Sequence, residues 1–369
     1  MQQGIMEQGE RISYYQHRHR LTIPQIAELR EFSGIAIADP ANKKMKLSSM
    51  SKVAELIRLS RLFKDHDLGF IPIKGPLLSW RLHHDAAVRY SNDLDILVKP
   101  EDLFRIIKVL KEDGYQPIHF DLPASGSKTK VIMKVNNQIG FIHPQKRIPV
   151  EVHWRLINLR VCPKSRLDNL INQNTESIIF HNETFTVFHK EFELVFLIIH
   201  GALHKWFRLK WLHDIVAFSK DEQLDWDRVI TISKEFQAEH LVHQAILLAD
   251  RFWNLPEKIT SRFIPERTAL KPFLIHFPLE SIAKKPKGTA EPGLYNWFRL
   301  IYGSIKYGLM IFPSMKYKYS FLKRLMFREK DMNVIKLPDF LTFMYYPMRP
   351  FLYVYSKLAP SNTRNRRQR

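Results

Sequence analysis

The spacing of apolar residues changes twice along the chain and divides it into three stretches. Residues 48–63 repeat apolar positions at helical spacing, with Val53, Leu56 and Phe63 on one face. Between residues 129 and 154 the period approaches two, which is typical of strands. From residue 191 onward the pattern is helical again. The strands expected in the middle stretch are 130–135, 138–143 and 148–154, and the later helices are 191–206, 210–219, 226–237 and 239–253.

Shorter signals fill the intervening segments. A strand at 70–73, a helix at 77–84, a strand at 93–98 and a helix closed by Asp113-Gly114 follow one another, and a hairpin joins 178–180 to 185–188. The order predicts an α+β fold: a small mixed sheet with flanking helices, followed by an all-α helical bundle. The expected domains are a helical extension (1–46), an α/β domain (47–160), a helical domain with the hairpin (161–283) and a basic aromatic region with a disordered tail (284–369).

The composition excludes sites that need several cysteines and indicates the charge of the expected partners. Cys162 is the one cysteine among 369 residues, so an internal disulfide framework and multi-cysteine metal sites are excluded. Lys and Arg number 57 against 37 Asp and Glu, a formal net charge of +20. Residues 261–369 hold 21 of these cations and six acids. Such a field favours anionic partners: nucleotides, nucleic acid or an acidic membrane surface.

The start of the chain and its hydropathy indicate a compartment. Residues 1–20 are polar and charged and lack the apolar core of a secretory signal. No run of 18 apolar residues occurs, so a membrane-spanning helix is not expected. We therefore expect a cytoplasmic protein, with peripheral membrane attachment as an open alternative.

Two aspartates interrupt the apolar strand at 93–98. Residues two apart on a strand share a face, so Asp93 and Asp95 are expected to point the same way. Two carboxylates so placed repel each other, and a divalent metal relieves the repulsion. The alternative is that one aspartate faces solvent or pairs with Arg89.

Two further segments carry chemistry. Gly75 follows a strand and begins a helix, a turn that offers backbone N–H groups to a phosphate, and Lys74 beside it adds a positive charge. Simple turn and surface roles are the alternatives for this pair. Downstream, Glu151 interrupts another β-branched strand and shares a face with His153. A third acid on a neighbouring strand would complete a carboxylate cluster of the two-metal type.

These residues resemble a known family. The runs Ile73-Lys74-Gly75-Pro76, Arg89-Tyr90-Ser91-Asn92-Asp93-Leu94-Asp95 and Glu151-Val152-His153-Trp154, in this order, are similar to the uncharacterised bacterial nucleotidyltransferases of the polymerase-β-like superfamily. The similarity extends over about residues 50–256, through His200 to His204 and Leu209 to Asp214.

The resemblance implies an activity. It implies transfer of a nucleotidyl group from an NTP, with ATP as the first expectation, to an unidentified hydroxyl acceptor, with release of pyrophosphate. Asp93, Asp95 and Glu151 would be the catalytic acids and would hold one or two Mg²⁺ ions. The nucleotide-binding residues implied are Lys74, Gly75, Arg89, Ser91, His204 and Lys210. Pro76 departs from the serine of the superfamily turn, so Lys74 is expected to meet the phosphate in its place.

The basic region leaves a second hypothesis open. Residues 295–327 mix ten aromatic residues with lysines and arginines. A membrane-surface helix, a nucleic-acid surface and a helical domain with a basic solvent face all fit this pattern. The alternative function is a catalytically inactive nucleotidyltransferase-fold module that associates with a membrane surface or nucleic acid through residues 284–369.

Overall fold

The computed structural model describes residues 8–32, 42–118, 120–122, 125–157, 162–264, 270–283, 294–328, 331–332 and 334–358. The expected linker at 284–293 and the arginine-rich tail lie outside the described residues. Clustering of contacts divides the chain into two compact units. Unit 1 comprises Met1–Leu97 and Val161–Ser314, and unit 2 comprises Val98–Arg160 and Met315–Arg369. The domain boundaries expected from the sequence stay predictions.

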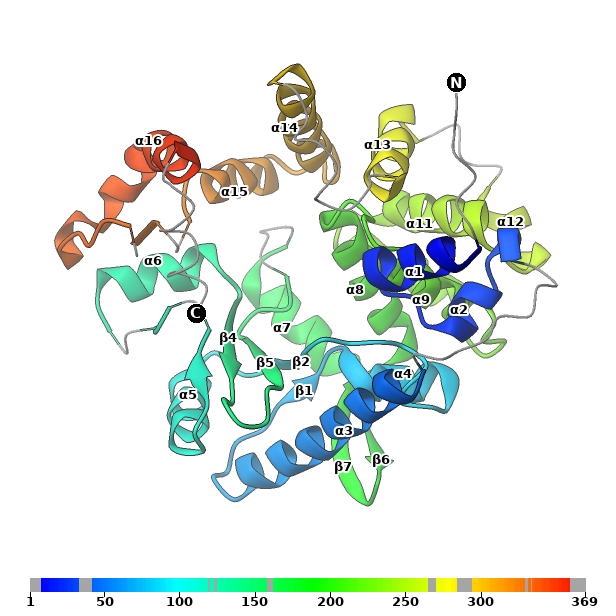
Figure 1. Cartoon of the computed structure of the whole chain (residues 1–369), viewed down its shortest axis with the longest axis horizontal. Coiled ribbons are helices and arrows are strands. Elements are labelled where there is room, and N and C mark those ends of the chain that lie inside the picture. Colours follow the sequence, from blue (N-terminus) through cyan, green and yellow to red (C-terminus); the bar gives the residue numbers. More distant parts are fainter. Residues whose placement is uncertain are drawn as a thin grey trace. The chain divides into compact units, whose positions relative to one another are not determined.

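The chain has the predicted α+β character (Figure 1). A five-stranded sheet has the order β1-β2-β5-β4-β3, and β6 and β7 form a separate hairpin. The pairs β1–β2, β3–β4, β4–β5 and β6–β7 are antiparallel. The strands are β1 (Ile71–Pro72), β2 (Leu94–Leu97), β3 (Gln116–Pro117), β4 (Gln138–Ile142), β5 (Pro149–His153), β6 (Thr175–Phe180) and β7 (Glu183–Phe188).

Among the helices before the hairpin, α5 follows the apolar periodicity closely. α5 buries Leu103, Ile106, Ile107 and Leu110 on one face, as their spacing predicts. At α2, Thr22 is the N-cap, and its backbone N–H donates to the Gln25 side chain at 3.0 Å. The helices in this part are α1 (Gln8–His19), α2 (Ile23–Ala27), the 3-10 helix η1 (Arg30–Phe32), α3 (Asn42–Lys64), α4 (Gly75–His83), α5 (Leu103–Glu112), α6 (Ser127–Val135) and α7 (Lys164–Gln173).

After the hairpin every regular element that the structure describes is helical, as expected for the all-α part. In unit 1, α8, α9 and α11 lie side by side (Figure 1). Their apolar side chains are part of the buried core. The helices are α8 (Lys190–Leu203), α9 (Leu209–Ser219), α10 (Trp226–Glu235), α11 (Glu239–Phe252), α12 (Glu257–Phe263), α13 (Pro272–Ala283), α14 (Leu294–Met310), α15 (Met315–Leu325), the 3-10 helix η4 (Asp339–Met344) and α16 (Tyr345–Leu358).

One predicted strand is wrong. Residues 130–135 belong to α6, which buries Thr129, Ile132 and Val135, three residues apart. The Asp339 carboxylate accepts hydrogen bonds from the backbone N–H groups of Ser127 (2.6 Å) and Lys128 (3.0 Å) at the start of this helix. The carboxylate therefore satisfies backbone donors that a helix N-terminus leaves unpaired. Asp339 lies more than 200 residues after Ser127 and Lys128 in sequence, so the apolar spacing around α6 could not predict this contact.

Candidate nucleotide and metal site

The turn between β1 and α4 requires a glycine. Gly75 has φ of +77°, in the left-handed region that side chains disfavour. A Cβ added there would lie 3.8 Å from the backbone oxygen of Asp93. The backbone N–H of Ile73 donates to the carbonyl oxygen of Asp95 at 3.1 Å. The turn thus lies directly against the segment that carries the two aspartates.

The two aspartates differ in burial. Asp95 lies within β2, all of whose residues are buried, and is 6% exposed, whereas Asp93 precedes the strand and is half-buried. The Lys74 ammonium lies 3.1 Å from Asp95 Oδ1, and its side chain is 12% exposed. Lys74 therefore partly neutralises a carboxylate that burial would otherwise leave costly.

Glu151 and His153 lie on β5 in unit 2. The Gln138 side-chain amide of β4 donates to Glu151 Oε2, and His153 Nε2 lies 3.7 Å from the same oxygen. The Asn137 amide nitrogen lies 3.3 Å from His153 Nδ1. The hydrogen bond from Gln138 orients the Glu151 carboxylate, and the His153 ring lies beside it.

Three ligand atoms converge. One donor atom each from Asp95, Glu151 and His153 lies within 4.8 Å of the other two, an arrangement that could hold a metal ion. The structure brings together two of the three predicted acids, and among the described residues Asp93 is not a member of this set. The site prediction left out His153, although its position two residues after Glu151 on a strand placed both on one face.

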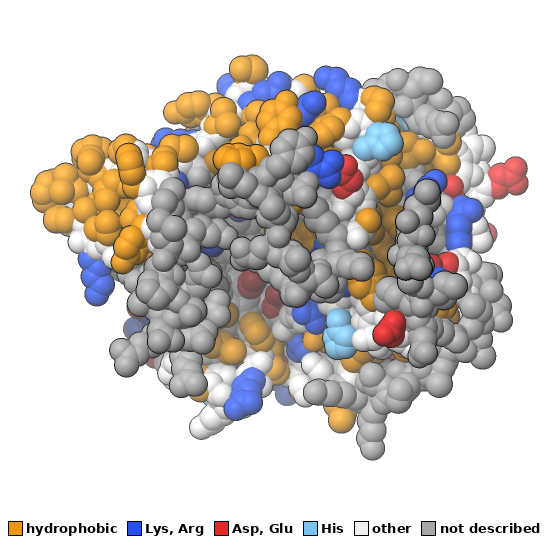
Figure 2. Space-filling model, turned by 45° about the horizontal axis from the view of Figure 1, so that its top comes forward, with side chains coloured by type: hydrophobic (Ala, Val, Ile, Leu, Met, Phe, Trp, Pro, Cys, Tyr) orange, Lys and Arg blue, Asp and Glu red, His pale blue; other side chains and the backbone are white. Residues whose placement is uncertain are grey.

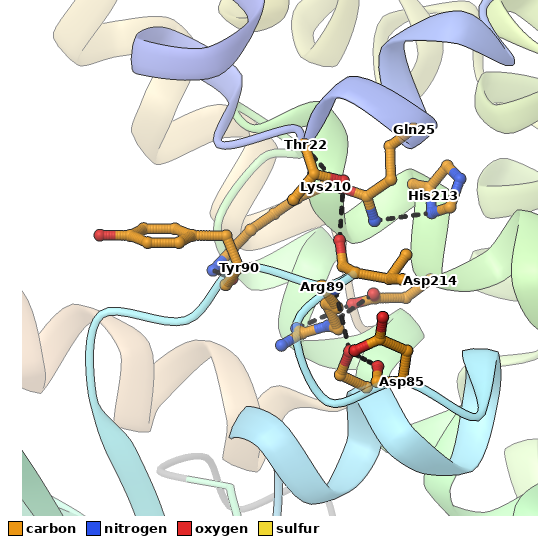
Figure 3. Close-up of polar contacts among 10 residues, drawn as sticks. Thr22, Gln25, Asp85, Arg89, Tyr90, Lys210, His213 and Asp214 are labelled. Carbon is orange, nitrogen blue, oxygen red and sulfur yellow. Dashed lines mark hydrogen bonds and ion pairs between the residues drawn. The ribbon is translucent and has the colours of Figure 1, made fainter. Parts of the chain in front are cut away.

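The loop from Asp85 to Asp93 is held in place by side chains of three elements (Figure 3). Ser79 Oγ of α4 donates to the Asp85 carbonyl at 2.7 Å and accepts from the Arg89 backbone N–H at 2.9 Å. Thr22 Oγ1 donates to the Val88 carbonyl at 2.7 Å. Lys210 Nζ of α9 reaches the Tyr90 carbonyl at 3.4 Å. Backbone groups of four residues before Asp93 thus have buried or half-buried side chains as hydrogen-bond partners. These residues are Asp85, Val88, Arg89 and Tyr90.

The same loop contains a closed ion pair. Arg89 Nε and one terminal nitrogen donate to the two Asp214 carboxylate oxygens at 2.7 and 2.9 Å. The side chains are 1% and 0% exposed. Burial opposes the charge on Arg89, but Asp214 outweighs it and raises the pKa of Arg89. The sequence predicted Arg89 as a nucleotide-binding residue, whereas in the structure its guanidinium faces Asp214, which the predicted site lacked.

Cationic groups of unit 1 surround the aspartate segment. Burial, then Arg89, lowers the pKa of Lys210 to about 7, although Asp214 and Asp93 oppose the shift. Burial also lowers the pKa of Lys52 in α3, and the charge of Asp93 opposes it. Burial, then Lys74, holds the pKa of His200 well below its usual value.

The remaining predicted residues are placed differently. Ser91 is buried at 6% exposure, in the loop before Asp93. His204 is exposed at the end of α8, and its ring packs against His200 and Trp211, with centroids 4.6 and 5.1 Å apart. The nucleotide-binding roles of both residues stay predictions.

A family comparison agrees with this geometry. The family model described as "Uncharacterised nucleotidyltransferase" matches residues 37–254, more than half of the chain. The chain belongs to this nucleotidyltransferase family. The match spans the glycine turn, Asp93, Asp95, Glu151 and α9. No similar curated protein and no similar solved structure was found.

Proposed function

We propose that the protein is a Mg²⁺-dependent nucleotidyltransferase that moves a nucleotidyl group from an NTP, with ATP as the first candidate, to a hydroxyl acceptor. The observation that carries this proposal is the approach of Asp95 and Glu151, 56 residues apart in sequence, in a chain of a nucleotidyltransferase family. In the reaction the acceptor oxygen bonds to the α-phosphorus, the bond from that phosphorus to the bridging oxygen breaks, and pyrophosphate leaves.

The donor chemistry fits a divalent cation. Two carboxylates with ligand atoms within 4.8 Å repel each other unless a positive charge lies between or beside them. Two of the three groups, Asp95 and Glu151, offer carboxylate oxygens, and oxygen is the donor that Mg²⁺ prefers. When bound, the ion supplies positive charge for the carboxylates and the triphosphate.

The chain's own residues supply positioning and charge. Gly75 gives the turn a backbone without a side chain, and Lys74 can turn from Asp95 to a phosphate oxygen. Glu151, oriented by Gln138, accepts the proton of the acceptor hydroxyl. Asp93 precedes Asp95 on the loop that Arg89, Ser79 and Lys210 hold, and serves as the second aspartate of the site.

Label transfer tests the proposal. The protein is incubated with each α-labelled NTP, Mg²⁺ and an extract of its source cells, and the labelled product is isolated. We expect Asp95→Asn and Glu151→Gln to lower transfer by about 10²-fold or more, because the charge that positions the nucleotide is lost. Asp102→Asn, an acid paired with Arg105 at 3.1 Å on α5, is the matched control. Full transfer by an Asp93→Asn/Asp95→Asn double variant would falsify the assignment.

The inactive-module hypothesis gives a different result in a binding assay. Thermal unfolding is followed with ATP, with Mg²⁺, and with both. Stabilisation that needs both and is lost in Asp95→Asn supports the enzyme. Stabilisation by ATP that is indifferent to the metal, combined with no label transfer, supports the module.

A further inference from the structure

The C-terminal elements of unit 2 carry an exposed apolar stripe. Phe340, Phe343, Phe351 and Tyr355 are 74%, 61%, 76% and 56% exposed. Met344 and Pro347 are exposed between them, so the stripe recurs every three or four residues through η4 and α16. Figure 2 shows hydrophobic side chains gathered at the left of the view, where Figure 1 places α16. We name these six residues the aromatic stripe.

The elements that carry the aromatic stripe are already packed on their opposite face. On the other face, Tyr345 and Leu352 are buried with Phe327 and Val135 of the same unit. The Tyr345 hydroxyl donates to the Ile335 carbonyl at 2.6 Å and accepts from the Leu337 N–H at 3.1 Å. The element is therefore packed and hydrogen-bonded on its inner side, and the outer phenylalanines contribute nothing to that packing.

A second row of exposed apolar side chains runs along α15. Met315, Tyr319, Leu322 and Met326 are 74%, 68%, 45% and 41% exposed and recur at helical spacing, whereas Tyr317 is buried on the opposite side. The Lys323 ammonium lies 5.5 Å from the centre of the Tyr346 ring at the start of α16. The row on α15 is thus adjacent to the elements that carry the aromatic stripe.

Basic residues outnumber acidic residues in the segment that carries these two rows. Residues 315–358 contain nine lysines and arginines and three acidic residues. Two of the acids serve inside the unit: Asp339 accepts from the backbone at the start of α6, and Asp331 pairs with Arg349 at 3.4 Å. The surface beside the aromatic residues is therefore cationic.

We propose that this face binds the surface of an anionic lipid bilayer. Phenylalanine and tyrosine side chains partition into the boundary between headgroups and acyl chains, and flanking lysines and arginines are attracted to anionic headgroups. Within the aromatic stripe no cation is interleaved, and Arg349 of the same helix is engaged by Asp331. A nucleic-acid surface needs cations among its stacking residues, so a lipid surface fits better.

Attachment by this face is peripheral. Among the described residues, no helix combines the length and the apolar composition needed to cross a bilayer. The aromatic stripe instead provides side chains that enter only the outer part of one leaflet. The attachment goes beyond the nucleotidyltransferase chemistry and does not depend on it.

Vesicle flotation tests the proposal with the full chain. We expect flotation with phosphatidylcholine vesicles that contain 30% phosphatidylserine, at least ten-fold weaker flotation with phosphatidylcholine alone, and weakening with added salt. The triple variant Phe340→Ser/Phe343→Ser/Phe351→Ser should float at least ten-fold less. Phe351→Ser alone, the most exposed position, should show a smaller loss in the same direction.

The matched control is Ile179→Ser, because Ile179 is 71% exposed but lies on the β6–β7 hairpin of unit 1. It should float like the wild type. Circular dichroism and thermal unfolding verify that each variant folds. The proposal is overturned if the wild type ignores anionic vesicles, if the aromatic variants float normally, or if these substitutions abolish only self-association or oligonucleotide binding.

Discussion

Unit 1 contains two buried aspartates with cationic partners, and the two pairs differ in construction. Arg89 meets Asp214 through two hydrogen bonds, and both side chains are almost wholly buried. Lys74 meets Asp95 at 3.1 Å with a compact ammonium, and its side chain is 12% exposed. The guanidinium fork fixes its partner in orientation, whereas an ammonium acts as a point charge that another cation can replace.

The difference indicates a structural role for the Arg89–Asp214 pair and a place in the candidate site for the Lys74–Asp95 pair. The Arg89–Asp214 pair joins the loop before Asp93 to α9. The Lys74–Asp95 pair lies at the glycine turn, beside Glu151 and His153. Under the proposed function, the Arg89–Asp214 pair holds the loop, while the Lys74–Asp95 pair exchanges its partner when a metal and a nucleotide bind.

The largest effect should come from opening the Arg89–Asp214 pair. Asp214→Asn leaves a buried guanidinium without its counter-charge, and we expect a loss of about 3–5 kcal/mol in the free energy of unfolding. Urea denaturation measures it. Arg89→Lys keeps the charge but loses the two-pronged geometry, so a smaller loss in the same direction is expected.

Asp250→Asn is the control for this prediction. Asp250 accepts from Arg30 at 2.9 Å, but the two side chains are 27% and 46% exposed. Such a surface pair contributes about 0–1 kcal/mol. Equal losses for Asp214→Asn and Asp250→Asn would contradict the structural role assigned to the buried pair.

The next effect is a pH dependence centred on His83. Burial, then His213 and Arg89, lowers the pKa of His83 to about 4, although Asp214 and Glu28 oppose the shift. His83 Nε2 has no hydrogen-bond partner within the described residues. Because the folded pKa lies below the usual 6.5, the contribution of the neutral ring to stability is present above pH 6.5 and is lost as pH falls toward 4.

Comparison of wild type and His83→Gln isolates this contribution. Between pH 7 and pH 4 the wild type should lose on the order of 2–3 kcal/mol more than the variant, measured by urea denaturation at each pH. His19, whose pKa burial lowers to about 3, destabilises both proteins equally in acid. Parallel stability curves for the two proteins would show that His83 is not held neutral.

Local patterns predicted most of the elements. The helical spacing of α5 and the alternating pattern of β4 and β5 depend on neighbours within a few residues, and the structure confirms them. α6 was missed because Thr129, Ile132 and Val135 fit a helix only when their burial is known, and because its N-terminal partner is Asp339. A short stretch of sequence does not predict secondary structure that depends on contacts with distant residues.

The site was predictable where strand geometry and family motifs acted together. The order of the Gly75, Asp95 and Glu151 segments brought these residues into the predicted site. The Arg89–Asp214 pair was not predicted because the two residues lie 125 positions apart in sequence, and no local pattern indicates that an arginine before a strand pairs with an aspartate on a later helix. The predicted site also left out His153, although its spacing of two residues from Glu151 was visible in the sequence.

The smallest effect tests the exchangeable pair. Lys74→Met removes an ammonium from the Asp95 carboxylate, and we expect a loss of about 1–2 kcal/mol in the free energy of unfolding in EDTA, because a buried carboxylate loses a cationic neighbour. Saturating Mg²⁺ should cancel most of this loss, since a divalent ion then neutralises Asp95 in place of Lys74. Asp214→Asn, measured alongside by urea denaturation, should gain no such relief. A Lys74→Met loss as large as that of Asp214→Asn, and equal with and without Mg²⁺, would mean that both pairs are scaffold and that Asp95 does not exchange its partner.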